Sequence, residues 1–234
     1  VVTNKFKAKK ELPKPEDIQK LREYCDKVFQ ENYDYLKEYG FNFSKWKQLG
    51  EVLLCQIMIF NRRRPGEISR ILLENYLDKQ KNRSGTVWIF ESFRNDMCRS
   101  VYHFIYKRQT RKEFEYSLAA RKYKVSWKLK GLDLFISFRQ QANIPDDNPY
   151  LFSYLNKEGY LCASLSLKKI SRECGAEKPE SLTGMYLRKH VATMCQLFNL
   201  NENELKQMAD FMCHTFDIHL SHYRMPEQTT QIIN

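Results

Sequence analysis

The apolar run from Val52 to Phe60 is the feature that most constrains how this chain folds. Its nine residues make up about half of the roughly 18 that a helix needs to cross a bilayer. Glu51 precedes the run and an arginine cluster follows it. The run therefore predicts a helix buried in a protein core, and a chain with 42% hydrophobic residues has enough apolar material to build one.

Apolar residues recur at helical spacing along most of the chain. The helices that this periodicity predicts span residues 16–39, 44–60, 67–76, 111–121, 132–142, 161–174, about 184–198, 204–212 and 216–225. Ser44 is expected to cap the second of them, and either Ser181 or Thr183 is expected to cap the seventh. Gly40 and Gly175 each follow a predicted helix, as glycine commonly does where a helix ends.

Extended structure is expected in two places only. Aromatic and β-branched residues alternate with polar ones from Lys122 to Trp127, and a short apolar segment runs from Tyr150 to Leu155. The predicted fold class is therefore mainly α with a small β-sheet. The chain divides into three parts, namely a Lys-rich linker or tail at residues 1–15, a connecting helix region at 16–43 and a main domain at 44–234.

The charge balance favours a polyanionic partner. Lys and Arg outnumber Asp and Glu by 39 to 28, which gives a net charge of +11 at pH 7. Among polyanions, nucleic acid is the commonest partner of such a protein. The seven cysteines are odd in number and contain no Cys-x-x-Cys pair, which predicts reduced thiols in a nucleus or cytosol.

Three separated segments place charged and nucleophilic residues at predicted helix boundaries. In the first, Arg64 is followed three residues later by Glu67, between two apolar helices. In the second, Arg188 lies in a helix that continues into an Ala-Thr pair. In the third, Tyr223 follows His214 by nine residues. Any one of these patterns is common, whereas all three in this order form a specific signal.

Together the segments resemble the catalytic boxes of the tyrosine recombinase (phage-integrase) family, over a stretch from about Trp46 to Gln231. That family has an Arg-x-x-Glu box at a helix start, a His-x-x-Arg helix ending in an Ala-Thr-like pair, and a histidine with a tyrosine nine residues later. More narrowly, three phrases look like integrase-like proteins of transposon origin in animal genomes, at residues 60–64, 148–152 and 223–227. The resemblance implies the integrase catalytic-domain fold.

The resemblance also implies a role for each residue in phosphodiester transfer. Arg64 and Arg188 would clamp the equatorial oxygens of the pentacoordinate phosphorus, since a planar guanidinium gives two hydrogen bonds and stays charged. His214 would donate to the same phosphate, and Tyr223 would attack it to form a 3′-phosphotyrosyl link. Glu67 would support the helix of Arg64. The family needs no metal and no nucleotide cofactor.

Two features depart from the family pattern. Met185 stands three residues before Arg188, where the family usually has histidine. The family's general acid is a lysine on a β-hairpin; Lys122, Lys124 and Lys128 are the candidates here, and no spacing selects one of them. Without a positioned acid, DNA cleavage is expected to slow by roughly 10²- to 10⁴-fold.

The expected partner is double-stranded DNA, with self-association on the DNA, and neither a membrane nor a small-molecule substrate is expected. Beside the catalytic residues, Arg62, Arg63, Lys189 and His190 are expected to contact the DNA. These expectations place the protein in DNA recombination or integration in a nucleus, or in the cytoplasm if the chain is prokaryotic.

Plainer interpretations exist for several of these residues. The arginines at 62–64 could form a solvated loop, and Arg188 could be a surface residue of an amphipathic helix. Trp46 is more typical of a core anchor than of a base-stacking platform. The residues that invite a zinc interpretation are Cys213, His214, His219 and His222. That interpretation is disfavoured because no second pair of ligands has finger spacing.

Three functions of different classes follow from these patterns. The first is an enzyme that cuts and rejoins DNA through Tyr223, which predicts a covalent protein–DNA adduct. The second is a domesticated, catalytically impaired recombinase fold, which predicts salt-dependent DNA binding that survives Tyr223→Phe. The third is a basic helical protein-interaction domain, which predicts negligible DNA affinity even at low salt.

Overall fold

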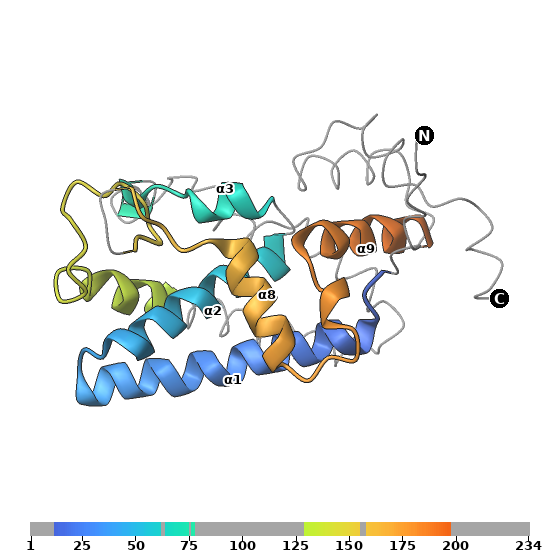
Figure 1. Cartoon of the computed structure of the whole chain (residues 1–234), viewed down its shortest axis with the longest axis horizontal. Coiled ribbons are helices and arrows are strands. Elements are labelled where there is room, and N and C mark those ends of the chain that lie inside the picture. The colour runs from blue at the N-terminus through green and yellow to red at the C-terminus, as the bar shows by residue number, and fades with distance from the viewer. Residues whose placement is uncertain (1–11, 62–63, 75, 78–128, 155–157, 198–234) are drawn as a thin grey trace, which may run out of the picture.

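The computed structural model describes residues 12–61, 64–74, 76–77, 129–154 and 158–197. Within them lie α1 (Pro15–Tyr39), α2 (Phe43–Asn61), α3 (Pro65–Ser69), α8 (Ala163–Glu173), the 3-10 helix η1 (Pro179–Ser181) and α9 (Gly184–Leu197) (Figure 1). Residues 129–137 are helical as well. The prediction of a mainly α protein is confirmed. The helices predicted at 111–121, 204–212 and 216–225 and the strand predicted at 122–127 lie outside the described ranges.

Helix α1 forms a long hairpin with α2 (Figure 1). It begins at Pro15, because the fixed φ of proline suits the first helical position. It ends at Tyr39, where Gly40 adopts a φ of 81° that a side chain would disfavour. Its buried apolar face recurs at helical spacing and consists of Ile18, Leu21, Cys25, Phe29 and Leu36. The helix predicted at residues 16–39 is therefore confirmed.

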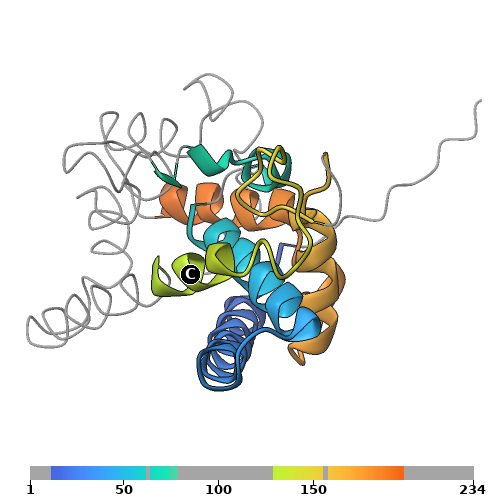
Figure 2. The same ribbon diagram turned by 90° about the vertical axis from the view of Figure 1, so that its left-hand side faces the viewer.

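Helix α2 is the centre of the core, as the apolar run predicts. Every residue from Val52 to Ile59 is buried. Figure 2, which looks along α1, shows α2 between α1 and α3. The predicted cap at Ser44 is wrong, because the side chain of Asn42 accepts a hydrogen bond from the backbone N–H of Lys45 at 3.1 Å and so caps the helix.

Trp46 anchors this core, as predicted. The residue is fully buried, and its indole N–H donates to the carbonyl of Phe135 at 2.9 Å. The two rings stack with centroids 4.7 Å apart. The contact fixes the helix at residues 129–137 against α2.

The helix predicted at residues 67–76 is interrupted. Helix α3 ends at Ser69, Leu72 forms an antiparallel bridge with Tyr150, and residues 73–74 and 76–77 are helical again. The backbone N–H of Leu73 donates to the carbonyl of Pro149 at 2.8 Å. The prediction is therefore confirmed at both ends of the span and wrong at residues 70–72, where pairing with a distant segment replaces the helical hydrogen bonds that the apolar periodicity suggests.

The described residues contain no regular strand, so the predicted small β-sheet is not formed by them. Among the described residues, extended pairing consists of two isolated bridges, Leu72 with Tyr150 and Ser153 with Tyr160. The strand expected from Tyr150 to Leu155 is thus reduced to two bridge positions. Its conformation is fixed partly by Arg139, whose guanidinium donates to the carbonyl of Tyr150 at 2.8 Å.

Two further helix ends differ slightly from the prediction. The regular helix predicted at 132–142 stops at residue 137, and the chain continues in turns to Asn143, whose φ is 53°. There the N–H of Ile144 donates to the carbonyl of Arg139, the bond of a Schellman cap. Helix α8 begins at Ala163 and ends before Gly175, whose φ is 72°.

Within the ranges that the structure describes, no helix combines the length and the apolar character that a membrane crossing requires.

Candidate functional site

Arg64 stands at the start of α3 and points its charge to the surface. Proline at position 65 disfavours helical geometry at Arg64, which is extended with a φ of −66° and a ψ of 133°. One guanidinium nitrogen lies 3.2 Å from Oε1 of Glu67, and the two side chains are 59% and 39% exposed. Glu67 therefore pairs with Arg64 directly while both remain accessible.

The other side of α3 is fixed to the core. Ile68 and Ser69 are each 1% exposed. The hydroxyl of Ser69 donates to the carbonyl of Pro65 and accepts from the backbone N–H of Ala163, both at 2.8 Å. Because Ala163 is the first residue of α8, this one hydroxyl joins the end of α3 to the start of α8.

Helix α9 carries the second candidate motif and begins at Gly184. The hydroxyl oxygen of Thr183 accepts from the backbone N–H of Tyr186 at 3.3 Å, so Thr183 caps the helix. Ser181 lies in η1, and its hydroxyl instead donates to the carbonyl of Lys178 at 2.7 Å. Of the two caps left open by the sequence, the structure selects Thr183.

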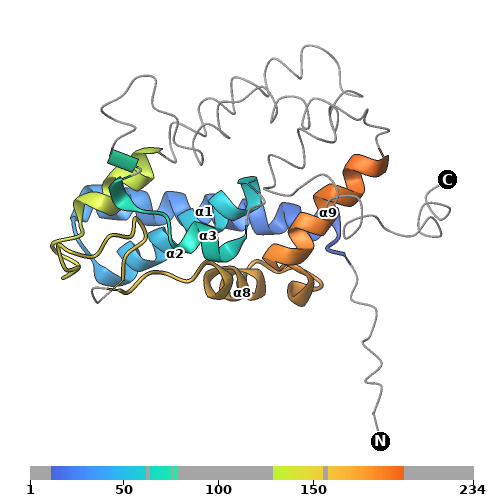
Figure 3. The same ribbon diagram turned by 90° about the horizontal axis from the view of Figure 1, so that it is seen from above.

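Helices α3 and α9 touch at their first residues (Figures 1 and 3). A Cβ atom built on Gly184 would lie 2.6 Å from Cγ of Pro65. Arg64 is the neighbour of Pro65, and Arg188 lies one helical turn after Gly184 and therefore on the same face of α9. The fold thus brings the first two motifs together although they are far apart in sequence.

Arg188 is buried in this arrangement. Only 3% of the residue is exposed, so the interpretation of Arg188 as a surface arginine is wrong. Arginine is almost never fully buried unless its charge is paired, because desolvation of that charge is costly. Its neighbours Lys189 and His190 are half-buried. Met185, in contrast, is 51% exposed.

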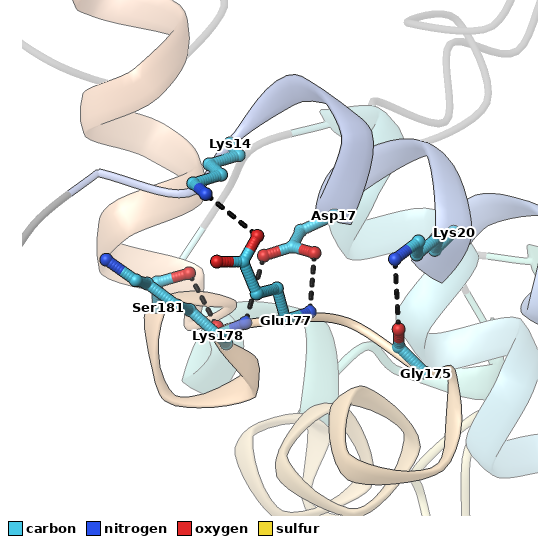
Figure 4. Close-up of polar contacts among 7 residues, drawn as sticks. All are labelled: Lys14, Asp17, Lys20, Gly175, Glu177, Lys178 and Ser181. Atoms are coloured by element: carbon cyan, nitrogen blue, oxygen red, sulfur yellow. Dashed lines mark hydrogen bonds and ion pairs between the residues drawn. The ribbon is translucent and has the colours of Figure 1, made fainter.

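The loop that leads into α9 is fixed to the first turn of α1 (Figure 4). The carboxylate of Asp17, 1% exposed, accepts from the backbone N–H groups of Glu177 at 2.7 Å and Lys178 at 3.1 Å. The ammonium of Lys14 lies 2.8 Å from Oε2 of Glu177. This pair raises the pKa of Lys14 and lowers the pKa of Glu177, because each side chain hydrogen-bonds the charged form of the other.

The remaining predicted site residues lie outside the described ranges, and these are Arg62, Arg63, Lys122, Lys124, Lys128, His214 and Tyr223. The zinc candidates Cys213, His219 and His222 lie there too. Where the chain is described, no three His, Cys, Asp or Glu side chains gather to hold a metal ion.

Sequence reasoning missed three residues that shape this region. Gly184 was not singled out, although a glycine in the first turn of a motif-bearing helix is a signal for close packing. Ser69 and Asp17 act through contacts with distant backbone groups, which no local pattern reveals.

Comparisons of this chain with models of protein families, with curated proteins and with solved structures gave no match. A function is therefore inferred from the chemistry of the residues described above and from their placement in the fold.

Proposed function

We propose that this chain is the catalytic domain of a tyrosine recombinase that cleaves and rejoins double-stranded DNA. One observation carries the proposal: Arg64 and Arg188, far apart in sequence, are presented by two helices whose first residues are in contact. The pattern of residues that resembles the family's catalytic boxes supports the same assignment.

Two guanidinium groups suit a phosphoryl transition state. Each offers a planar pair of N–H donors that match two phosphate oxygens and keeps its charge at every relevant pH. Arg188 is 3% exposed, so a phosphate bound at its guanidinium would lie where charge is screened less than in water. Loss of one such preorganised donor typically costs about 3 to 4 kcal/mol of transition-state stabilisation.

In the proposed reaction, the phenol of Tyr223 gives up its proton to solvent water as its oxygen attacks the phosphorus, and the bond from phosphorus to the 5′-oxygen breaks. The leaving 5′-oxygen takes a proton from Lys122, Lys124 or Lys128, and His214 donates a hydrogen bond to a non-bridging oxygen. Attack by a free 5′-hydroxyl reverses the step and restores the phosphodiester. The step consumes no metal, nucleotide or redox cofactor.

The charge of the chain suits the same substrate. With a net charge of +11, the protein is attracted to the DNA backbone, and each neutralised phosphate releases counterions. Arg62, Arg63, Lys189 and His190 are the proposed additional DNA contacts. The setting that we propose is DNA recombination or integration in a nucleus, with copies of the chain meeting on the DNA.

A covalent-adduct assay tests the proposal. The full chain is incubated at low salt with a pool of nicked duplexes of randomised sequence, whose broken strand cannot be rejoined, and is then run on a denaturing gel. Wild type is expected to form a protein–DNA species that Tyr223→Phe does not form. The proposal fails if wild type binds the duplexes and yields no adduct.

One observation favours a second candidate, a domesticated fold that binds DNA without cutting it. Met185 is 51% exposed at the position where the family usually has histidine, and a thioether donates no proton. This candidate predicts that wild type and Tyr223→Phe bind duplex DNA equally, with the same salt dependence, and that neither forms an adduct. Strand transfer by the wild type would exclude it.

A further inference from the structure

We propose that Gly184 and Pro65 are positioning residues that set the spacing between the guanidinium groups of Arg64 and Arg188. This inference rests on the proposed function, because it concerns how the two arginines reach one phosphate. Neither Gly184 nor Pro65 is proposed to contact the phosphate or to take part in the bond-breaking step.

Gly184 and Pro65 are packed so closely that a side chain at position 184 would overlap the proline ring. A Cβ atom on Gly184 would lie 2.6 Å from Cγ and 3.1 Å from Cδ of Pro65. Its 3.4 Å distance from Sδ of Met58 would be an ordinary contact, so the clash is with the Pro65 ring alone. A carbon–carbon distance of 2.6 Å is too short for a packed structure, so the ring or the backbone must shift.

Pro65 is a rigid partner for this contact. A long side chain could rotate away from an added methyl group, whereas the pyrrolidine ring is closed onto its own backbone and fixes φ. The far end of α3 is held by the hydrogen bond between Ser69 and the start of α8. A substitution at Gly184 is therefore expected to move the starts of α3 and α9 apart.

Both arginines lie close to the contact. Arg64 is the residue before Pro65, and Arg188 lies one turn after Gly184. A displacement at the contact therefore changes the separation of the two side chains. In a site that holds a reacting phosphate, a misplacement of about 1 Å costs roughly 100-fold in rate.

The test compares wild type, Gly184→Ala, Pro65→Ala and the double variant in three measurements, namely urea unfolding, the salt dependence of duplex binding and the rate of adduct formation. Gly184→Ala is expected to lower the adduct rate roughly 100-fold. It is also expected to make the slope of log affinity against log salt shallower by about 0.9, because one phosphate contact is lost. A merely destabilising change leaves that slope unaltered in the folded fraction.

The double variant provides the rescue. Pro65→Ala removes the ring atoms Cγ and Cδ that an alanine at 184 would meet. The double variant is therefore expected to recover most of the rate and the wild-type salt slope. Gly66→Ala is the matched control, because its added Cβ would meet only the flexible end of Arg70, at 3.4 Å. If Gly184→Ala does not fold, Pro65→Ala alone still tests the idea, with an expected loss of about tenfold in rate.

Two results overturn the inference alone: a folded Gly184→Ala protein with the wild-type salt slope and adduct rate, or a double variant no better than Gly184→Ala. A wild-type protein that neither binds nor cuts DNA overturns the proposed function and the positioning role with it. In that case the unfolding measurements still report whether the two residues are coupled, so the two failures are distinguishable.

Discussion

The carboxylate of Asp17 accepts a hydrogen bond from the backbone N–H of Glu177 at 2.7 Å, across 160 residues of sequence. The same carboxylate accepts from Lys178 at 3.1 Å and is 1% exposed (Figure 4). A buried charge is retained only where hydrogen bonds compensate its desolvation, and here two backbone amides do so. The loop before α9 is therefore fixed to α1 by one side chain.

We expect Asp17→Ala to lower the free energy of unfolding by about 2 to 3 kcal/mol, because it leaves two amides without their charged acceptor. Chemical denaturation measures the change. Asp34→Ala is the matched control, since Asp34 also lies on α1 but is exposed and accepts only from Gln30. Equal losses for the two variants would contradict the role that we give to burial.

Ser69→Ala is expected to destabilise the protein by about 1 to 3 kcal/mol, because the buried N–H of Ala163 loses its acceptor. Hydrogen exchange should show faster exchange at Ala163 than in the wild type. Ser137→Ala is the control, because its exposed hydroxyl makes a similar bond to a carbonyl three residues earlier but supports no second element. An unchanged exchange rate at Ala163 would show that the hydroxyl of Ser69 does not hold α3 and α8 together.

The raised pKa of Tyr24 predicts that the protein loses stability at alkaline pH. Burial, together with a hydrogen bond to Glu173, raises the pKa of Tyr24 to about 12. The unfolded value is about 10, so the folded state favours the neutral phenol. The resulting stability is fully present below about pH 10 and is lost as the pH rises toward 12.

Between those two pH values, the unfolding free energy of wild type is expected to fall more steeply than that of Tyr24→Phe. Urea midpoints at several pH values measure the difference. Tyr39→Phe, at a residue that is 68% exposed, should follow the wild type. Parallel curves for wild type and Tyr24→Phe would show that Tyr24 titrates alike in both states.

The sequence predicted the helices whose signals are local. The apolar stripe of α1 and the run in α2 lie on faces that can be buried only in a helical core. Gly40 and Gly175 mark helix ends because both adopt a positive φ. These features depend on neighbours a few residues away, which a sequence displays directly.

The failed predictions have different causes. The helix predicted at 67–76 is interrupted where Leu72 and Leu73 pair with the distant segment at Pro149 and Tyr150, whereas the cap at Ser44 is replaced locally by Asn42. In the candidate site, Arg64 and Arg188 lie on helices whose first residues are in contact, and their roles in catalysis are proposed. The burial of Arg188 could not be foreseen, because it depends on how α9 packs.

The ion pair between Arg64 and Glu67 gives a last prediction: its loss is expected to slow adduct formation while it leaves the stability of the protein almost unchanged. The pair is exposed, so Glu67→Gln is expected to change the unfolding free energy by less than about 1 kcal/mol. Loss of the carboxylate removes the charged partner that orients the guanidinium, and it raises the net charge of the protein by one, which favours DNA binding. Adduct formation by bound protein should therefore slow while duplex affinity rises slightly.

Single-turnover rates at saturating duplex separate these two effects. Glu31→Gln is the matched control: Glu31 lies 3.9 Å from Lys27 on α1, is also exposed, and its substitution adds the same charge away from the candidate site. The control should show the small gain in affinity and no loss of rate. A fall in rate for both variants would trace the effect to net charge, and an unchanged rate for Glu67→Gln would mean that Arg64 needs no orienting partner.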